Sequence, residues 1–475
     1  MPCPTWVAVM ASVTAVPSAS HPRAPAARRN NRGVKGATRC RVDAGLITVV
    51  MFKDANPAPA GVQQQRRKWM KRLFCALLAA GLTACGAAGP PPRAAPGRPG
   101  CVTEFSAEKN YFPHQVKAEY AKGWQVRYER SYKVLKTTVQ AAGGHAKAGS
   151  REIDSTYVLL QCGAPRPELT GELAGATVIE VPVRTMADGG SVLYASLEKL
   201  GKADALVGYA EPFIGDVEAP YLPKIAERIK AGKVAEIGYE VNYEALADAD
   251  PDFYTNYAGD DQTFSKIEEL GIPIVFYFPY SETPLGAAEQ IKFLSLFFNA
   301  EQRAQQVFDP IEERYLKLRA QIDAHVAGQK KPKVLIGTVG ESGSVTTRQR
   351  ERFEPQLIRE AGAEPVPDLP GGGIATLSLE KFLDAGADTD YWMDLVFFPK
   401  HKTGADYIAG DDRLARLPAL ENGRTFHRVG ARGADYFLNG ALEADLILRD
   451  MVNLLHPELL KSGDELQFVK HVPAE

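Results

Sequence analysis

The sequence predicts an α/β protein with two Rossmann-like lobes joined by a long interlobe helix, and three observations lead to that fold. Short apolar runs rich in β-branched residues alternate with helical stretches in two separate series. Such alternation is typical of mostly parallel sheets covered by helices. A long amphipathic helical pattern lies between the two series, and a similar capped helical unit occurs once in each of them.

The first series supplies the N-terminal lobe. Helices are expected at 191–200 and 264–270, between apolar runs of strand length. Before the series, alternating residues within 102–139 suggest an antiparallel hairpin or sheet edge. The expected strands of this lobe are 156–162, 176–183, 205–209, 253–257 and 272–278.

The second series supplies the C-terminal lobe. Apolar runs at 333–338, 391–398 and 425–429 predict its strands, and the pattern from 438 to 455 predicts a closing helix. The order of elements therefore repeats the α/β alternation of the first lobe.

A helical segment joins the series, in two pieces at 284–298 and 301–327. At about 1.5 Å per residue, the second piece would reach roughly 40 Å, which suits a strut between lobes better than an ordinary core helix. Pro310 predicts a kink or a new helix start, because proline removes a helical hydrogen bond. Apolar residues recur along the second piece at steps of three and four, at Ala304, Val307, Phe308, Ile311, Tyr315, Leu318, Ile322 and Val326.

The capped unit that occurs once per lobe carries an early glutamate. In the first lobe Asn242 precedes Glu244, and in the second Ser378 precedes Glu380. Asn and Ser are favoured N-caps, and a carboxylate in the first turn complements the helix dipole. Capping explains each glutamate by itself, but it does not explain why the unit is repeated.

The segment 70–85, MKRLFCALLAAGLTAC, has the order of a secretory signal. Lys71 and Arg72 precede an apolar run of ten residues, which is too short to span a membrane permanently. The ending at Cys85 resembles the bacterial lipobox, in which the cysteine is lipidated. An ordinary cleaved signal or a short buried helix is the alternative.

The segments around this signal complete the expected domain organisation. Because a signal works at the N-terminus, we expect translation to start at Met70, or 1–69 to be a disordered extension. A Pro/Gly-rich stretch follows the signal and is typical of a tether. The expected boundaries are 1–69, signal 70–84, tether 85–100, N-terminal lobe 101–284, interlobe helices 285–328 and C-terminal lobe 329–475.

Charge and cysteines narrow the class of protein further. Residues 1–84 hold 13 Lys and Arg against 2 Asp and Glu, whereas 85–475 hold 43 against 56, a formal charge of -13. Such an acidic body argues against nucleic acid as a partner. The mature part keeps Cys85, Cys101 and Cys162. With Cys85 lipidated, Cys101 and Cys162 form either a disulfide or two buried thiols.

Taken together, these features resemble the iron-siderophore/cobalamin family of ABC-importer binding proteins, over roughly 157–460. The repeated unit, the strut and the lipobox carry the resemblance. So do Pro284-Leu285-Gly286 with Ile291-Lys292-Phe293, and Ala444-Asp445-Leu446 with 455–459 (LHPEL).

The resemblance implies a shallow cleft between the lobes and a monomeric, lipid-anchored periplasmic protein. Its expected ligand is a chelated metal, a ferric siderophore first and cobalamin or haem next. Glu244 and Glu380 would pair with arginines of the permease, since rim charges steer encounter and fix orientation.

The cleft of such a fold is lined by loops at the facing strand ends. Aromatic faces suit flat chelates, and Arg or Lys suit carboxylates. The loop 337–344 departs from the related branch, which has an aromatic, Pro-Gly segment there. We expect further contacts from 342–348, 371–373, 400–402 and 432–436. The candidate ligand residues are Tyr209, Glu211, Tyr239, Tyr257, Tyr280, Glu282, Ser342, Ser344, Arg348, Lys400, Arg432 and Tyr436.

A bare metal ion, a cofactor and catalysis are not expected. The histidines of the body are scattered in the sequence, and we expect His456 to have a structural role. They are His114, His145, His325, His401, His427, His456 and His471. The loop 337–344 lacks the Gly-Lys-Ser/Thr of a P-loop, and Gly-x-Ser-Gly around Ser342 is not a nucleophile elbow. A secreted α/β hydrolase and a surface lipoprotein that binds only a partner protein remain the alternatives.

Overall fold

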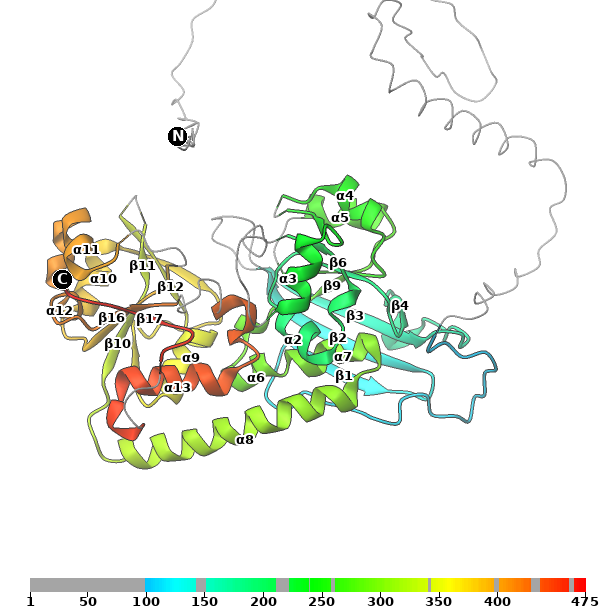
Figure 1. Cartoon of the computed structure of the whole chain (residues 1–475), viewed down its shortest axis with the longest axis horizontal. Coiled ribbons are helices and arrows are strands. Elements are labelled where there is room, and N and C mark those ends of the chain that lie inside the picture. Colours follow the sequence, from blue (N-terminus) through cyan, green and yellow to red (C-terminus); the bar gives the residue numbers. More distant parts are fainter. Residues whose placement is uncertain are drawn as a thin grey trace, which may run out of the picture. The chain divides into compact units, whose positions relative to one another are not determined.

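The computed structural model describes residues 99–141, 151–210, 222–238, 240–257, 261–340, 343–396, 401–428, 436–460 and 465–475 (Figure 1). The expected extension, the signal, Cys85 and most of the tether lie outside these residues. None of the described helices combines the length and the apolar character needed to cross a membrane. The candidate ligand residues that also lie outside them are Glu211, Tyr239, Ser342, Lys400 and Arg432.

The first lobe is built on a five-stranded parallel sheet with the order β7-β6-β5-β8-β9. Its strands are β5 (Met186–Asp188), β6 (Leu206–Tyr209), β7 (Ala235–Glu236), β8 (Tyr254–Asn256) and β9 (Ile274–Phe276). Its helices are α2 (Tyr194–Leu200), α3 (Pro223–Lys230), α4 (Tyr243–Ala249) and α5 (Asp261–Glu269). The expected parallel sheet is confirmed, although its central strand, β5, was not among the expected strands.

A separate four-stranded sheet with the order β1-β2-β3-β4 precedes this lobe in sequence. The expected strands 156–162 and 176–183 lie here, so their assignment to the parallel sheet is wrong. The reason is that β2 pairs with β3 over ten antiparallel positions, and β4 then adds to β3 in parallel. Apolar runs predict strands but not their partners. The strands are β1 (Trp124–Tyr128), β2 (Tyr132–Ala141), β3 (Arg151–Gln161) and β4 (Thr177–Val181).

The second lobe has a sheet with the order β13-β10-β15-β16-β17, in which β17 alone is antiparallel to its neighbour. A three-stranded antiparallel sheet, β11-β12-β14, lies beside it in sequence. The strands are β10 (Lys333–Ile336), β11 (Thr338–Val339), β12 (Ser344–Arg348), β13 (Glu364–Val366), β14 (Ile374–Ser378), β15 (Tyr391–Asp394), β16 (Thr425–His427) and β17 (Lys470–Val472). The helices are α9 (Phe353–Glu360), α10 (Leu379–Gly386), α11 (Gly404–Gly410), α12 (Pro418–Glu421) and α13 (Ala444–Leu455).

Three helices connect the lobes: α6 (Pro284–Ala288), α7 (Gln290–Phe298) and α8 (Glu301–Val326). Helix α8 continues through Pro310, so the expected alternative of a new helix start there is wrong. Proline removes one hydrogen bond, and the apolar face of α8 compensates by being buried, for instance at Phe308 and Ile311. Figure 1 shows α8 as one long helix with α13 beside its C-terminal half.

One hydrophobic core runs through the described part of the chain. It contains Leu206 of the first lobe, Phe293 and Phe308 of the connecting helices, and Met393 and Phe426 of the second lobe. All five side chains are fully buried. Because both lobes pack on the same helices, the core ties the two sheets to one frame.

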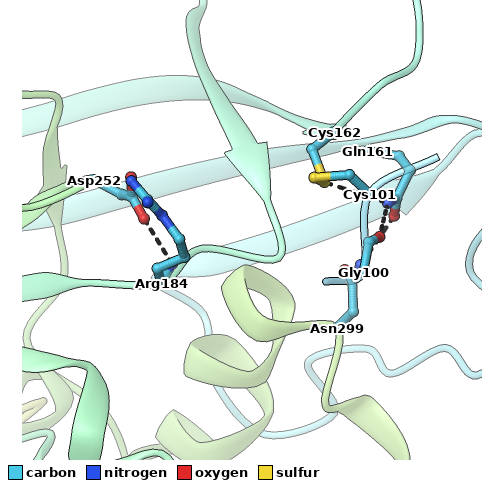
Figure 2. The surroundings of a disulfide bond; sticks show 7 residues. All are labelled: Gly100, Cys101, Gln161, Cys162, Arg184, Asp252 and Asn299. Atoms are coloured by element: carbon cyan, nitrogen blue, oxygen red, sulfur yellow. Dashed lines mark hydrogen bonds and ion pairs between the residues drawn. A yellow bond between two sulfur atoms is a disulfide. The ribbon is translucent and has the colours of Figure 1, made fainter. Parts of the chain in front are cut away.

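A disulfide and two amide contacts hold the start of the described chain (Figure 2). Cys101 is bonded to Cys162 directly after β3, at a sequence separation of 61. Beside it, Gln161 Nε2 donates to Gly100 O at 2.7 Å, and Asn299 Nδ2 donates to Gln161 Oε1 at 3.0 Å. The N-terminal segment is thereby joined both to its own sheet and to the turn between α7 and α8.

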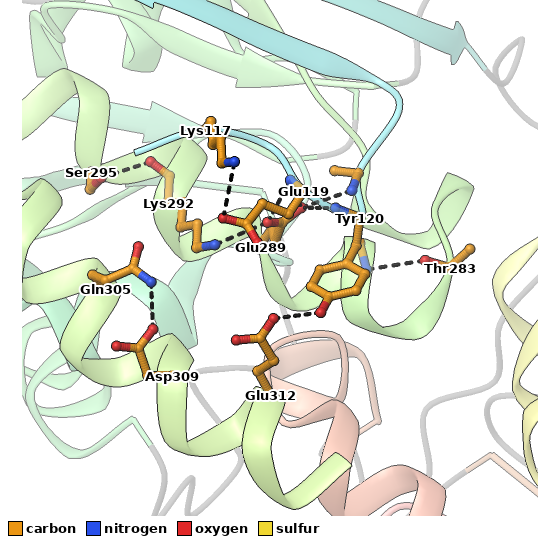
Figure 3. Close-up of polar contacts among 12 residues, drawn as sticks. Lys117, Glu119, Tyr120, Thr283, Glu289, Lys292, Ser295, Gln305, Asp309 and Glu312 are labelled. Carbon is orange, nitrogen blue, oxygen red and sulfur yellow. Dashed lines mark hydrogen bonds and ion pairs between the residues drawn. The ribbon is translucent and has the colours of Figure 1, made fainter. Parts of the chain in front are cut away.

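Buried charges anchor the segment that leads into β1 (Figure 3). The Glu289 carboxylate accepts from the backbone N–H groups of Glu119, Tyr120 and Ala121 at 2.8–3.0 Å, and it pairs with Lys292 at 3.1 Å. Both charged side chains are almost fully buried. A carboxylate removed from water needs such partners, so Glu289 fixes where this segment lies on α7.

Candidate ligand-binding site

Three largely buried arginines surround one buried glutamate at the start of α9. Arg428 Nη1 lies 2.6 Å from Glu354 Oε1, and Arg348 Nε lies 3.6 Å from Glu354 Oε2. Arg352 is the N-cap residue of α9 and also acts electrostatically on Glu354. We call these four residues the arginine cluster. Three guanidinium charges face a single carboxylate, so the cluster carries excess positive charge.

Several donors of the arginine cluster are unpaired within the described residues. Arg428 Nη2 donates to Leu395 O at 2.5 Å, and Arg352 Nη1 donates to Ser281 Oγ at 3.0 Å. The buried Nε atoms of all three arginines, together with Nη1 of Arg348, have no hydrogen-bond partner. Unpaired buried donors cost free energy, so each calls for an explanation such as an ordered water or a bound ligand.

Aromatic side chains of both lobes meet beside the arginine cluster. Tyr280 stacks on Tyr436 with ring centroids 5.7 Å apart, and its hydroxyl donates to the Tyr436 carbonyl. Phe278 stacks on Tyr257 at 4.1 Å and lies 5.2 Å from the Arg352 guanidinium. Tyr257, Phe278 and Tyr280 belong to the first lobe, whereas Arg352 and Tyr436 belong to the second. The cluster therefore lies where the lobes touch.

Burial and charge act against each other in this cluster. Burial lowers the pKa of the Arg348 guanidinium to about 10, although Glu354 acts in the opposite direction. Burial alone would raise the pKa of Glu354, but Arg348, Arg428 and Arg352 together lower it. Glu354 thus stays ionised, and a second anion placed here would relieve the remaining cationic excess.

Each parallel sheet carries a buried aspartate at the carboxyl end of its central strand. Asp188 ends β5 and accepts from Gly190 N at 3.1 Å, while Asp394 ends β15 and accepts from Val396 N at 3.1 Å. Both strands flank the point where strand order reverses, which is where ligands of open α/β sheets bind. Burial raises the pKa of both carboxyl groups, that of Asp188 to about 6.

The structure brings some of the expected ligand residues together and separates others. Tyr257, Tyr280, Arg348 and Tyr436 belong to the arginine cluster and its aromatic border. Ser344 lies at the other end of β12 from Arg348, opposite Ser378. Tyr209 is buried at the end of β6.

Glu282 has a different environment from the one expected of a cleft residue. It is buried, and its carboxylate accepts from Lys122 N at 2.8 Å and Gly123 N at 2.6 Å. It also lines a hollow of about 350 Å³ together with Gly372 and Gly373 of the expected loop 371–373. Since its acceptors are engaged by the N-terminal segment, we leave Glu282 out of the proposed ligand site.

Sequence reasoning missed Arg352, Glu354 and Arg428. The sequence did contain one signal of this site. Arginine occurs at every second position at and just after the end of a strand, at Arg348, Arg350 and Arg352. In a strand, residues two apart share a face, but β12 ends at Arg348, so this rule does not place Arg350 and Arg352. Arg352 is buried in the cluster and the Arg348 side chain is 12% exposed, whereas Arg350 is exposed and pairs with Asp368 at 2.8 Å.

The repeated capped units form as expected. Asn242 Oδ1 accepts from Ala245 N at 3.1 Å, and Ser378 Oγ accepts from Lys381 N at 3.4 Å. Glu244 and Glu380 are both exposed in the first turn of their helices. Arg416 lies 3.1 Å from Glu380, so this carboxylate already has an exposed partner within the chain.

Comparison with known proteins agrees with this two-lobed arrangement. The family model for periplasmic binding proteins matches residues 194–428, from α2 to the last arginine of the cluster. This part of the chain belongs to the periplasmic binding protein family. Because the family is one of binding proteins, the match argues against the hydrolase alternative.

Individual relatives of the binding protein are distant. An uncharacterized lipoprotein of Methanocaldococcus jannaschii is 25% identical over 336 residues, which cover 67% of this chain and 77% of the relative. A periplasmic heme binding protein from Pseudomonas aeruginosa is 16% identical, with a TM-score of 0.46 over 61% of this chain and 98% of that structure. A periplasmic vitamin B12 binding protein of Vibrio cholerae is 15% identical, with a TM-score of 0.43 over 59% and 99%.

The raised pKa of Asp188 predicts a pH-dependent effect of Asp188→Asn. A folded pKa of about 6 against 3.8 means that the stabilisation linked to this group is present below pH 3.8 and is lost as pH rises through 6. Asn cannot ionise, so the stability of the variant relative to the wild type should rise by about 2 kcal/mol between pH 4 and pH 8. Urea unfolding at several pH values measures this difference.

The control for this prediction is Asp248→Asn, at an exposed position of α4. Its stability relative to the wild type should not vary with pH in the same range. A difference for Asp188→Asn that is equally flat would contradict the assigned pKa.

Proposed function

We propose that the chain is the substrate-binding component of an ABC importer, which captures a metal chelate bearing anionic groups and delivers it to a membrane permease. The observation that carries the proposal is the arginine cluster, where three largely buried guanidiniums surround the Glu354 carboxylate at the contact between the lobes. A ligand carboxylate could take the unpaired Nε and Nη1 donors of Arg348.

The aromatic border of the cluster favours a chelate over a simple anion. Tyr257 and Phe278 present partly exposed rings beside the Arg352 guanidinium, whereas Tyr280 and Tyr436 are buried against each other. Such faces suit the apolar or conjugated parts of a chelate, while the arginines suit its acidic groups. A ferric siderophore with carboxylate groups fits this combination first, and haem or cobalamin come next.

The neighbouring hollow is a poorer place for an anion. Its lining includes Glu152, Glu282 and Glu351, against Lys122 as the basic residue. Like charges would repel a carboxylate-bearing ligand there. The charges of the two sites thus favour the arginine cluster for the proposed class of ligand.

A lipid anchor outside the inner membrane completes the proposal. The segment 70–85 has the order of a lipoprotein signal that ends at Cys85. The relative in M. jannaschii is also named a lipoprotein. We propose a monomer held at the membrane surface through Cys85 and the tether 85–100, with no resident cofactor.

A thermal-shift screen of the purified full chain tests this function. Ferric siderophores with and without carboxylate groups, haem, cobalamin and free metal ions are the probes. A native-state ligand at 100 times its Kd should stabilise the protein by about 2.7 kcal/mol, a measurable rise in Tm. Stabilisation by an anionic chelate supports the proposal. Failure of every chelate to raise the Tm contradicts it.

Arg348→Gln should weaken binding of the anionic chelate about tenfold or more without lowering stability. The variant removes unpaired donors and one of three mutually repelling cations, so its free energy of unfolding should be unchanged or higher. Titration calorimetry gives the Kd, and urea unfolding gives the stability.

The matched control is Arg350→Gln, two residues away on the exposed side. It should leave the Kd within a factor of about two, because exposed ion pairs contribute little. Equal Kd values for the two variants would show that Arg348 does not bind the chelate. A large loss of stability in Arg348→Gln would instead assign it a structural role.

Glu244→Ala and Glu380→Ala should reduce transport while leaving the Kd for the chelate unchanged. Both carboxylates are exposed at helix starts, one on each lobe, where they could pair with arginines of a permease. Uptake of labelled chelate in a reconstituted importer measures transport. Glu269→Ala, at an exposed position of α5, serves as the control. Loss of affinity in the first two variants would contradict the docking role.

A further inference from the structure

Two histidines that are far apart in sequence meet at the end of α8. His325 lies in the last turn of α8, and His456 is the C-cap residue of α13. Glu458 follows within the short 3-10 helix Pro457–Leu459. A ring nitrogen of each histidine and a carboxylate oxygen of Glu458 lie within 4.8 Å of one another. These histidines are far apart in the sequence, and the packing of α13 on α8 brings them together.

The three side chains differ in burial in a way that suits a ligand site. His456 is only 5% exposed, and its Nε2 atom has no hydrogen-bond partner among the described residues. His325 Nε2 lies 2.7 Å from Glu458 Oε1, and both of these side chains are partly exposed. The His456 imidazole is therefore held in place by packing, while the side chains of His325 and Glu458 can move because they are partly exposed to solvent.

A hollow of about 280 Å³ adjoins the cluster and is lined by all three residues. Asp390 and Arg424, which precede β15 and β16, also line it, as does Pro332 before β10. The hollow thus lies at the amino ends of these parallel strands. Asp394 and Arg428 lie at the carboxyl ends of the same sheet, so the two sites occupy opposite edges of the lobe.

We propose that His325, His456 and Glu458 bind one divalent first-row transition-metal ion, with Zn²⁺ the best match. Two imidazoles and one carboxylate are donors that Zn²⁺ takes in tetrahedral sites, with a solvent molecule in the fourth position. Metal binding would replace the contact between His325 Nε2 and Glu458 Oε1, with any displaced proton released to solvent and both atoms kept as ligands.

The three ligand atoms must move closer together to hold the ion, and the partly exposed side chains of His325 and Glu458 allow this movement. Ligands held at 2.0–2.2 Å in a tetrahedron are about 3.4 Å apart, against an upper limit of 4.8 Å here. The same hollow is also lined by three basic residues, Lys330, Lys331 and Arg424. Their positive charge disfavours Ca²⁺ or Mg²⁺, which are bound mainly by electrostatic attraction. Nitrogen ligation by imidazole therefore selects a transition metal over Ca²⁺ or Mg²⁺.

The proposed ion would join the interlobe helix to the end of the second lobe. His325 ends α8, and the other two ligands follow directly after α13, so metal binding would clamp these two helices together. The inference goes beyond the proposed function and does not depend on it, because it concerns no chelate and no permease.

Zinc competition tests the proposal on the untagged full chain freed of metal by chelator dialysis. Zn²⁺ is titrated against a chromophoric chelator, and Tm is followed in parallel. The wild type should bind one equivalent and show a higher Tm with Zn²⁺. His325→Gln and Glu458→Gln should weaken that site by roughly tenfold or more and lose the Tm rise. Both positions are partly exposed, so these variants should fold.

His471→Gln is the matched control, since His471 is exposed on β17 and is not one of the three donors. It should bind one equivalent with unchanged affinity. The proposal is overturned if the wild type binds no Zn²⁺. It is equally overturned if both test variants keep wild-type affinity, which would assign the zinc to other residues. Because chelate affinity is not measured, neither result bears on the proposed function.

Discussion

One continuous hydrophobic core, shared by both lobes and the helices between them, is the constraint on which the other features depend. Phe293 of α7 and Phe308 of α8 belong to the same core as Leu206 and Met393 of the two parallel sheets. A close-packed interior resists deformation, so moving one lobe against the other would open this core. Because the lobes share this core, we expect one lobe to move little against the other, and the proposed ligand to bind on a nearly fixed frame.

The shared core also holds the arginine cluster together. Isolated in water, three guanidiniums would separate, but here packing holds Arg348, Arg352 and Arg428 around Glu354. The protein accepts unpaired donors and like-charge repulsion in this cluster. A preorganised cationic site binds without the entropy cost of assembling it, which is the physical advantage of placing it where the lobes are already joined.

The sequence was sufficient for the fold class because hydrophobic periodicity reports local structure. It predicted the long helix through 301–327, most of the parallel strands but not β5, β7 or β13, and the capped starts at Asn242 and Ser378. It could not assign partners to β3 and β4, since an apolar run carries no record of what it pairs with. The site residues were also hard to predict, because they come from distant parts of the sequence and meet only in the folded chain. Arg428 lies 74 residues from Glu354, and His325 and His456 meet only through helix packing.

Small-angle X-ray scattering of the full chain, with and without a saturating chelate, tests the central claim most directly. If one core fixes both lobes, the radius of gyration and the distance distribution should agree between the two states within experimental error. A clear decrease on binding, of the size produced by domain closure, would mean that the lobes move as separate bodies. That result would contradict a rigid frame built on α7 and α8.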